Sequence, residues 1–283
     1  MRKWKKWMAA GIVFLAAPLV ITLCLRGFSR EDTLQFADAE EETLLYMMAA
    51  EISPECEIET LKMQAVIERT RYKKALQDQT KEPDQLTPQE LVAKWGSRNY
   101  STYYEKFQQA VIATSGEVIT CDGAYIYPEF HYLSSGQTRS MEEVYGRTEF
   151  PYLKSVDSSQ DLDNPDYLNV TFIKKKDFQK KCQETWNLAG EKIENIALDG
   201  AGYVKELTLD GRVISGAEMQ KLLDLPSESF SIKESGDSYR IVSKGIGHGF
   251  GVSIYGANEM AKQGASYRNI LEYYYTGIQI LAE

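Results

Sequence analysis

Glu51 is the residue of this sequence best suited to act as an acid. It follows the small and apolar residues Met48, Ala49 and Ala50 and stands shortly before Pro54. Apolar surroundings raise the pKa of a carboxylic acid, because they favour its uncharged form. Such a group can donate a proton near neutral pH, so Glu51 is a candidate general acid. The commoner alternative for a charged residue beside an apolar run is a solvated glutamate at a helix end.

A glycine-rich segment at residues 245–257 is a second unusual feature. Glycines occupy alternate positions from 245 to 251 around His248, one of only two histidines. Glycine inside a strand usually marks a bulge or a close approach of another backbone. The segment is therefore expected to present His248 and Tyr255 where a ligand has space to bind. The alternative is a structural histidine whose ring satisfies buried backbone groups.

Lys62 and Arg69 are candidate cationic groups. They are seven positions apart, which places both on one stripe of a helix. On that stripe they could line a groove and stabilise developing charge. The alternatives are a solvated face for both, or a clamp from Arg69 to Glu51 or to a loop carbonyl.

A loop that begins at His131 offers further polar groups. Tyr132 is followed by Ser134 and Ser135, whose hydroxyls and backbone N–H groups suit the hydroxyls of a carbohydrate. The alternative is an ordinary surface loop with a packed histidine. A Ser–His–Asp hydrolase is disfavoured, because the sequence has no G-x-S-x-G turn. We expect this loop and the segment 245–257 to form opposite walls of one groove that holds Glu51.

The elements that must position these residues indicate an α+β fold. Helical and strand patterns do not alternate regularly, and Asp-Gly pairs at 122–123 and 210–211 predict hairpin turns. A helix that ends near Glu51 should be followed by a second helix after Pro54, and residues 75–90 read as a linker. The other expected helices are 90–114, 177–189, 216–225, 257–263 and 266–275, the last with Gly277 as its C-cap.

The N-terminal residues predict a membrane anchor. Residues 8–25 carry no charge and are long enough to cross most of a bilayer, and four of the six residues before Trp7 are Lys or Arg. This pattern predicts a cytoplasmic tail at 1–7, a single uncleaved transmembrane helix at 8–25, a stalk at 26–41 and an extracytoplasmic domain at 42–283. A cleaved signal peptide or a lipoprotein at Cys24 is the alternative. Neither has the small residues expected before a cleavage site.

Composition limits the partners of the external part. After residue 30 the chain has 26 basic and 41 acidic residues, which argues against binding nucleic acid and suits a neutral sugar. Cys56, Cys121 and Cys182 are an odd number and are expected to be free thiols. Since no C-x-x-C or H-x-x-x-H pair is present, we predict no metal and no cofactor.

These motifs together resemble the stage II sporulation protein D family over roughly residues 42–280. The resemblance is carried by Ala49-Ala50-Glu51, by Leu-Lys-x-Gln-Ala-Val-x-x-Arg-Thr at 61–70 and by the glycine segment. The family's catalytic glutamate matches Glu51. Relatives that bind zinc use a cysteine near the histidine loop, where this chain has serines. Ile254 and Gln220 also depart from the usual Gln and Arg.

The resemblance implies a membrane-anchored lytic transglycosylase of spore engulfment. Such an enzyme cuts the β-1,4 bond between N-acetylmuramic acid and N-acetylglucosamine in peptidoglycan, preferably in peptide-stripped strands, and leaves 1,6-anhydro ends. One acid suffices for that route, whereas hydrolysis usually uses two carboxylates. The implied partners are glycan strands, a cell-wall amidase or endopeptidase and a membrane scaffold of the engulfing septal membrane. The main alternative is a non-catalytic, glycan-binding activator of a peptidoglycan amidase. A purely structural anchor is a third.

Overall fold

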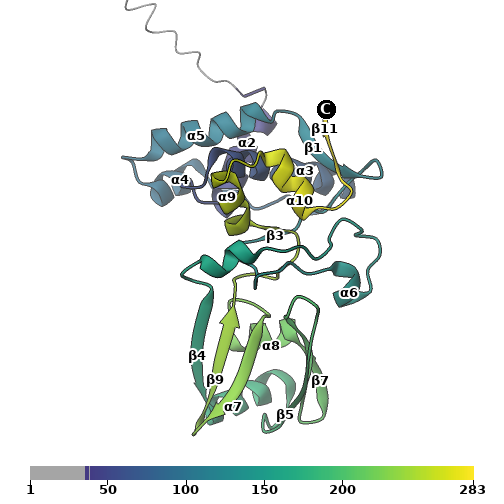
Figure 1. Cartoon of the computed structure of the whole chain (residues 1–283). Helices are drawn as coiled ribbons and strands as arrows, with labels where there is room; N and C mark the ends of the chain where they lie inside the picture. The colour runs from purple at the N-terminus through teal and green to yellow at the C-terminus, as the bar shows by residue number, and fades with distance from the viewer. Residues whose placement is uncertain (1–35, 38) are drawn as a thin grey trace, which may run out of the picture. The chain divides into compact units, whose positions relative to one another are not determined.

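The fold combines a mainly helical region and a β-rich region, each with its own hydrophobic core. The structure is a computed structural model that describes residues 36, 37 and 39–283 (Figure 1). The predicted α+β class is confirmed. The predicted tail, the anchor at 8–25 and most of the stalk lie outside the described residues. Within the described residues, no helix has both the length and the apolar character needed to span a bilayer.

The helical region is built around one long helix whose middle is buried. Residues 60–70 of this helix, apart from the half-buried Lys62, are buried, because other helices and a small sheet surround them. Its helices are α2 (Ala39–Glu51), α3 (Ile58–Asp78), α4 (Pro88–Trp95), α5 (Tyr100–Ala113), α9 (Ile254–Lys262) and α10 (Tyr267–Tyr274). The sheet is antiparallel, with the order β11 (Gln279–Ala282), β1 (Glu117–Cys121), β2 (Ala124–Tyr125).

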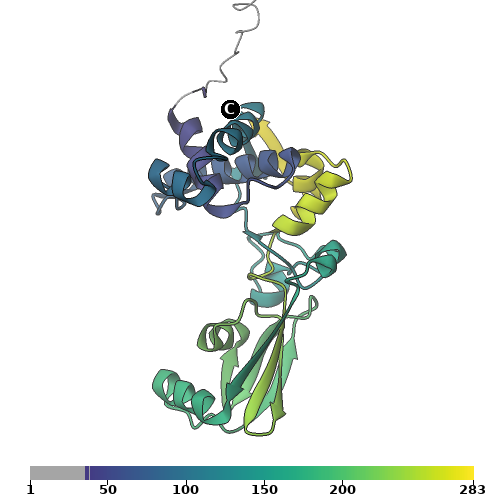
Figure 2. The ribbon, with the colours of Figure 1, turned by 90° about the vertical axis from the view of Figure 1, so that its left-hand side faces the viewer.

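The β-rich region contains two three-stranded antiparallel sheets, and the ribbon turned by 90° shows them with two helices beside them (Figure 2). The sheet orders are β4-β9-β8 and β5-β6-β7. The strands are β4 (Leu168–Lys174), β5 (Ile193–Leu198), β6 (Val204–Leu209), β7 (Arg212–Ser215), β8 (Phe230–Ser235) and β9 (Ser238–Lys244). The helices α7 (Lys175–Trp186) and α8 (Gly216–Leu223) complete the core.

Short elements connect these regions. They are β3 (Phe130–His131), α6 (Met141–Tyr145), the 3₁₀ helix η1 (Ser159–Asp163) and β10 (Val252–Ser253). β3 and β10 pair in parallel, with Val252 opposite Phe130 and Ser253 opposite His131. The histidine loop and the glycine segment are therefore hydrogen-bonded neighbours. The prediction that they form opposite walls of a groove is wrong, because this pairing puts them on the same wall.

Several element boundaries differ from the sequence prediction. α3 continues to Asp78, where an ion pair between Lys74 and Asp78 (3.0 Å) supports the last turn. The expected single helix at 90–114 is two helices, α4 and α5, with Gly96 as the C-cap of α4. α10 ends with Tyr275 as its C-cap rather than Gly277. The hairpin turns are confirmed, with positive φ at Asp122-Gly123 and Asp210-Gly211.

Candidate active site

Glu51 is the last residue of α2 and lies at the protein surface. The chain leaves the helix here because Ser53 precedes Pro54, and a residue before proline avoids helical angles. The last carbonyl groups of the helix are satisfied from α4: Lys94 Nζ donates to Ala49 O (2.6 Å) and Ala50 O (3.2 Å). The Glu51 side chain is 33% exposed. It is therefore anchored by its backbone while its carboxyl group remains accessible.

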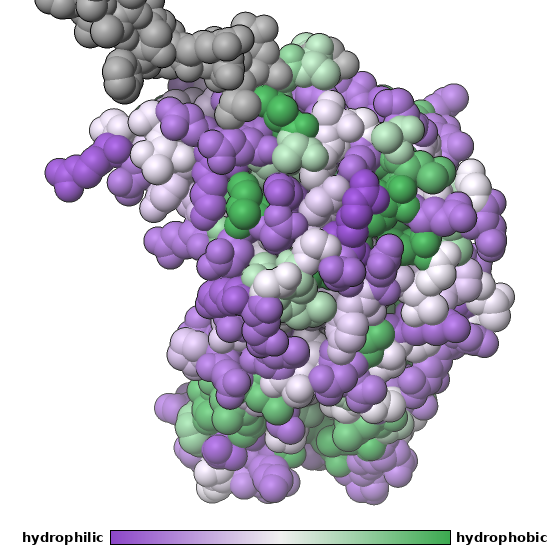
Figure 3. Space-filling view, turned by 45° about the horizontal axis from the view of Figure 1, so that its top comes forward, coloured by the Kyte–Doolittle hydropathy of each residue, from purple (hydrophilic) through white to green (hydrophobic). Residues whose placement is uncertain are grey.

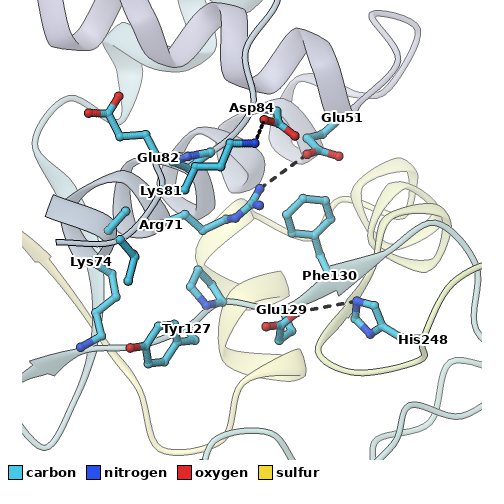
Figure 4. Close-up of a pocket in the computed structure, with 14 residues that line it drawn as sticks. Glu51, Arg71, Lys74, Lys81, Glu82, Asp84, Tyr127, Glu129, Phe130 and His248 are labelled. Carbon is cyan, nitrogen blue, oxygen red and sulfur yellow. Dashed lines mark hydrogen bonds and ion pairs between the residues drawn. The ribbon is translucent and has the colours of Figure 1, made fainter. Parts of the chain in front are cut away.

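Glu51 lines a hollow of about 470 Å³, which we call the first hollow (Figure 4). Most of its lining side chains are charged or polar. They come from the end of α2, from α3 and the loop after it, and from the strand β3 and the glycine segment. The other lining residues are Arg71, Lys74, Ala75, Thr80, Lys81, Glu82, Pro83, Asp84, Tyr127, Pro128, Glu129, Phe130 and His248.

Arg71 is the cation nearest to Glu51 among the ion pairs of this hollow. Its Nη1 atom lies 3.7 Å from Glu51 Oε1 and donates to both carboxyl oxygens of Glu68, at 2.9 and 3.0 Å. The guanidinium also lies over the ring of Phe130, 5.1 Å from its centre. Arg71 points from α3 toward Glu51, beside the ring of Phe130 (Figure 4). Its hydrogen bonds to Glu68 hold it from α3 itself.

Glu68 is a second carboxyl group close to this centre, and its side chain is fully buried. It also accepts a hydrogen bond from Gln64 Nε2 at 2.8 Å. Burial raises the pKa of Glu68 to about 7, although Arg71 and the hydrogen bond from Gln64 oppose the shift. Glu68 therefore changes its charge near neutral pH without contacting solvent.

His248 lines the first hollow, and the ring of His131 lies beside it with ring centres 5.8 Å apart. His248 Nε2 is 3.6 Å from Glu129 Oε2, and His248 Nδ1 accepts a hydrogen bond from Phe250 N. Burial lowers the pKa of His248, although Glu129 opposes this. His131 is itself buried, and its Nδ1 is 3.0 Å from Phe250 O. Burial lowers the pKa of His131 to about 3, so its ring is neutral at neutral pH.

A second hollow of about 470 Å³ lies on another side of Glu51. Its character is more aromatic, since Trp95 and Tyr103 contribute to it with ring centres 5.9 Å apart. The other lining residues are Ile52, Ser53, Pro54, Glu55, Lys94 and Asn99. Glu51 lines both hollows, so parts of one ligand could bind on two sides of this residue.

Arg69 does not line either hollow. Its side chain is 1% exposed, forms two hydrogen bonds to Glu41 (2.6 and 2.8 Å) and donates to the carbonyls of Glu117 and Val111. The prediction of a groove-lining stripe is therefore wrong for Arg69, because that face of α3 is covered. Lys62 pairs with Glu59 (2.6 Å), away from both hollows.

The hydroxyl groups of the histidine loop are engaged in the protein. Ser134 is fully buried; its N–H donates to Asp161, and its Oγ accepts from Gly136 N. Ser135 Oγ donates to Ala201 O. Ser134 therefore has a structural role in the loop, whereas the half-buried Ser135 hydroxyl, which donates one hydrogen bond, can still accept one from a ligand, so its contact with a carbohydrate stays a prediction. Tyr132 is 46% exposed.

Tyr255 and the possible metal ligands complete the predicted set. Tyr255 is partly buried, and its N–H donates to Tyr132 O, so its backbone is part of the link between the two segments. Neither tyrosine lines the two hollows at Glu51. Cys56, Cys121 and Cys182 are free thiols, as expected. In the described part of the chain, no three His, Cys, Asp or Glu side chains are grouped to hold a metal ion.

Sequence analysis missed Arg71 and Glu68, the two residues that bring charge to Glu51 from α3. A signal for them was present in their i, i+3 spacing, which places opposite charges side by side on a helix. Glu129 and Phe130 were also missed, although they directly precede His131.

The fold and the two hollows define a class: an α+β domain with an open, polar cleft, unlike the enclosed apolar pockets of most small-molecule sites. A family model described as Stage II sporulation protein matches residues 36–121, from before α2 to the end of β1. Stage II sporulation protein D of Bacillus amyloliquefaciens is 33% identical over 256 residues, which cover 85% of this chain and 73% of the relative. The chain belongs to the stage II sporulation protein D family.

Two further relatives match smaller shares. Stage II sporulation protein D of Bacillus subtilis (strain 168) is 33% identical over 203 residues, 68% of this chain and 55% of that protein. This chain therefore spans little more than half the length of that relative. The amidase enhancer of Bacillus subtilis is 35% identical over 105 residues, 37% of this chain and 13% of the enhancer.

Proposed function

We propose that this protein is a peptidoglycan lytic transglycosylase that acts during sporulation, with Glu51 as its catalytic acid and base. The observation that carries the proposal is the placement of the Glu51 carboxyl group, partly exposed and shared between two open hollows. A glycan strand laid across Glu51 would have sugar units on both sides of the bond to be cut. The names of the two Bacillus stage II sporulation proteins support the link to sporulation.

The proposed reaction needs one carboxyl group and no water. Protonated Glu51 donates its proton to the oxygen that joins N-acetylmuramic acid to N-acetylglucosamine, and the bond from this oxygen to the muramic C1 breaks. Glu51, now a carboxylate, removes the proton from the muramic C6 hydroxyl, whose oxygen bonds to C1. The products are a free N-acetylglucosamine end and a 1,6-anhydro muramic end, and Glu51 is protonated again.

Arg71 supports the middle of this sequence. When Glu51 has given up its proton, the carboxylate has a guanidinium 3.7 Å away. A cation at that distance stabilises the negative charge, so proton donation becomes less costly. Glu68 cannot act on the glycan directly, because its side chain is fully buried.

A largely hydrophilic surface suits a protein that acts on a hydrated polymer. Hydrophilic side chains dominate the face seen in Figure 3, and hydrophobic ones form separate small patches. We further propose that residues 8–25 anchor the protein as a single-pass helix in the engulfing septal membrane, with residues 42–283 outside. Its partners there are peptidoglycan strands, a cell-wall amidase or endopeptidase and a membrane scaffold.

The test is the digestion of purified, peptide-stripped glycan strands, followed by mass spectrometry of the products. An anhydro end lacks the mass of one water molecule compared with a hydrolysed end, so the products distinguish the two reactions. Glu51→Gln keeps the size and hydrogen-bonding capacity of the side chain but removes the acid, and we expect cleavage to fall by at least about a thousandfold.

Glu57→Gln is the matched control. Glu57 is exposed, precedes α3 and forms no capping bond with its side chain. Its replacement should leave cleavage unchanged. Hydrolysed ends, or a Glu51→Gln protein as active as the control, would contradict the proposed mechanism.

The match to an amidase enhancer supports a second candidate, a glycan-binding protein that activates an amidase. This candidate predicts that the unaltered protein binds glycan without releasing anhydro ends. It also predicts that Glu51→Gln still stimulates the amidase. The same digestion, repeated with an added amidase, separates the two functions.

A further inference from the structure

The ion-pair chain Glu68–Arg71–Glu51 contains a buried acid that the proposed reaction does not use. Arg71 Nη1 contacts both carboxyl oxygens of Glu68 at hydrogen-bonding distance, whereas Glu51 is farther away, at 3.7 Å. Arg71 is therefore shared unequally by two carboxyl groups. One of them is fully buried, and the other, 33% exposed, lies where a glycan would bind.

We propose that Glu68 is a positioning residue for Glu51. Glu68 holds the Arg71 guanidinium beside the catalytic carboxyl group and limits how strongly the guanidinium favours the ionised form of that carboxyl group. The inference rests on the proposed function of Glu51. It extends that function with a residue that never touches the glycan and acts only through Arg71.

The electrostatic effect follows from the charge on Glu68. When Glu68 is neutral, the positive charge of Arg71 is unopposed and favours loss of the Glu51 proton. When Glu68 is ionised, it offsets Arg71 and adds a second negative charge nearby, so the negative charge that forms on Glu51 during the reaction is less stabilised. Glu68 gains its charge near pH 7. Its opposition to Arg71 therefore increases over the pH range in which a general acid would otherwise lose its proton.

Other groups near this chain do not replace Glu68. On α3 itself the neutral Gln64 donates to Glu68, and the charged group of α2 that acts on Glu68 is Glu51. Tyr275, after α10, is fully buried, which raises its pKa well above the ordinary value and keeps it neutral. From the loop after α3, Asp84 faces Arg71 but pairs with Lys81 at 2.6 Å.

The experiment compares pH profiles of kcat/KM for the unaltered protein and Glu68→Gln between pH 5 and 9, with glycan cleavage as the readout. Glutamine keeps an oxygen for Arg71 but cannot become negative. We expect the alkaline limb to move to lower pH by roughly one unit, with a tenfold loss at pH 8 and little change at pH 5.5. KM should stay the same, because Glu68 does not contact the glycan.

Arg71→Gln provides an opposite and independent test. Without the guanidinium, Glu51 should hold its proton to higher pH, so the alkaline limb should move upward. Adding Glu68→Gln to Arg71→Gln should then produce a smaller shift than Glu68→Gln alone, since the connecting cation is missing. Arg71→Gln by itself tests whether the guanidinium shifts the alkaline limb, which the role of Glu68 requires; an unchanged limb would refute the inference.

The outcomes separate this inference from the proposed function. A Glu68→Gln profile that superimposes on the original, or one lowered equally at every pH, would refute the positioning role while Glu51→Gln remains inactive. Retained cleavage by Glu51→Gln would instead refute the proposed function itself.

Discussion

The first hollow has two walls that are built in different ways. The helical wall consists of Glu51 on α2 and Arg71 on α3, and ion pairs set its geometry. The strand wall consists of residues 127–130, which lead into β3, and His248 of the glycine segment; β10 pairs with β3, and close backbone packing sets the geometry of this wall. The helical wall therefore contributes the charged side chains, whereas the close backbone packing of the strand wall leaves almost no space for added atoms.

The two walls also bury titratable groups of opposite kinds. Burial raises the pKa of Glu68 to about 7 behind the helical wall and lowers that of His131 to about 3 in the strand wall. Both groups are mainly neutral near pH 6. Their effects on stability oppose each other: a rising pH charges Glu68 in the folded protein, whereas a falling pH favours the unfolded state, in which His131 can take up a proton.

The largest effect is expected in the strand wall, from Gly251→Ala. Gly251 has φ +69°, and an added Cβ would lie 1.8 Å from the carbonyl oxygen of Glu129. Because this atom belongs to the backbone before β3, the two strands would have to separate. We expect a loss of about 4 kcal/mol or more in the free energy of unfolding, measured by chemical denaturation.

Gly236→Ala is the control for that variant. Gly236 also has a positive φ (+63°), but no atom lies within 4 Å of an added Cβ. Its replacement should cost only about 1 kcal/mol from backbone strain. Equal losses for both variants would mean that close packing does not distinguish the strand wall.

How much of this could be predicted from sequence depends on whether a feature is local. The end of α2 at Glu51 follows from Ser53-Pro54, and the two Asp-Gly turns follow from the residues that accept positive φ. The presence of Glu51 and His248 in one hollow was also expected. These features depend on a few adjacent residues whose backbone preferences are known.

The features that could not be predicted depend on contacts between distant residues. The parallel pairing of β3 with β10 joins segments about 120 positions apart. Ser134 N–H donates a hydrogen bond to Asp161, and no sequence pattern near either residue predicts this contact. The helical periodicity of α3 placed Lys62 and Arg69 on one stripe. It could not predict that Arg69 would be covered, because the helices that pack on α3 come from both ends of the chain.

A second prediction tests whether the helical wall also depends on a buried support. Arg69→Met keeps the volume of the side chain but removes the cation that binds Glu41 at 2.6 Å. Removing one member of a buried ion pair is strongly destabilising, and we expect a loss of about 3 kcal/mol in the free energy of unfolding. Lys62→Met, at a partly exposed pair on the same helix, should cost less than about 1 kcal/mol. Similar costs would show that burial of Arg69 has no energetic consequence.

The smallest expected effect is the contribution of His131 to the pH dependence of the free energy of unfolding. This effect tests the contrast between the two walls. The folded protein holds His131 neutral down to about pH 3, whereas the unfolded chain protonates it below about pH 6.5. The stabilisation that neutral His131 gives to the folded state is thus fully present above pH 6.5. This stabilisation is lost as the pH falls toward 3, at up to about 1.4 kcal/mol per pH unit. Between pH 6.5 and 5 the loss is about 2 kcal/mol.

His131→Asn isolates this contribution, because asparagine offers an N–H donor to Phe250 O but does not titrate. Denaturation at pH 6.5 and 5 should show a smaller acid-induced loss for the variant than for the unaltered protein, by about 2 kcal/mol. Glu68→Gln should change the stability in the opposite direction, with its gain over the unaltered protein appearing as the pH rises from 4.5 to 7. If the two variants shifted the pH dependence in the same direction, the opposite protonation preferences of the two walls would be refuted.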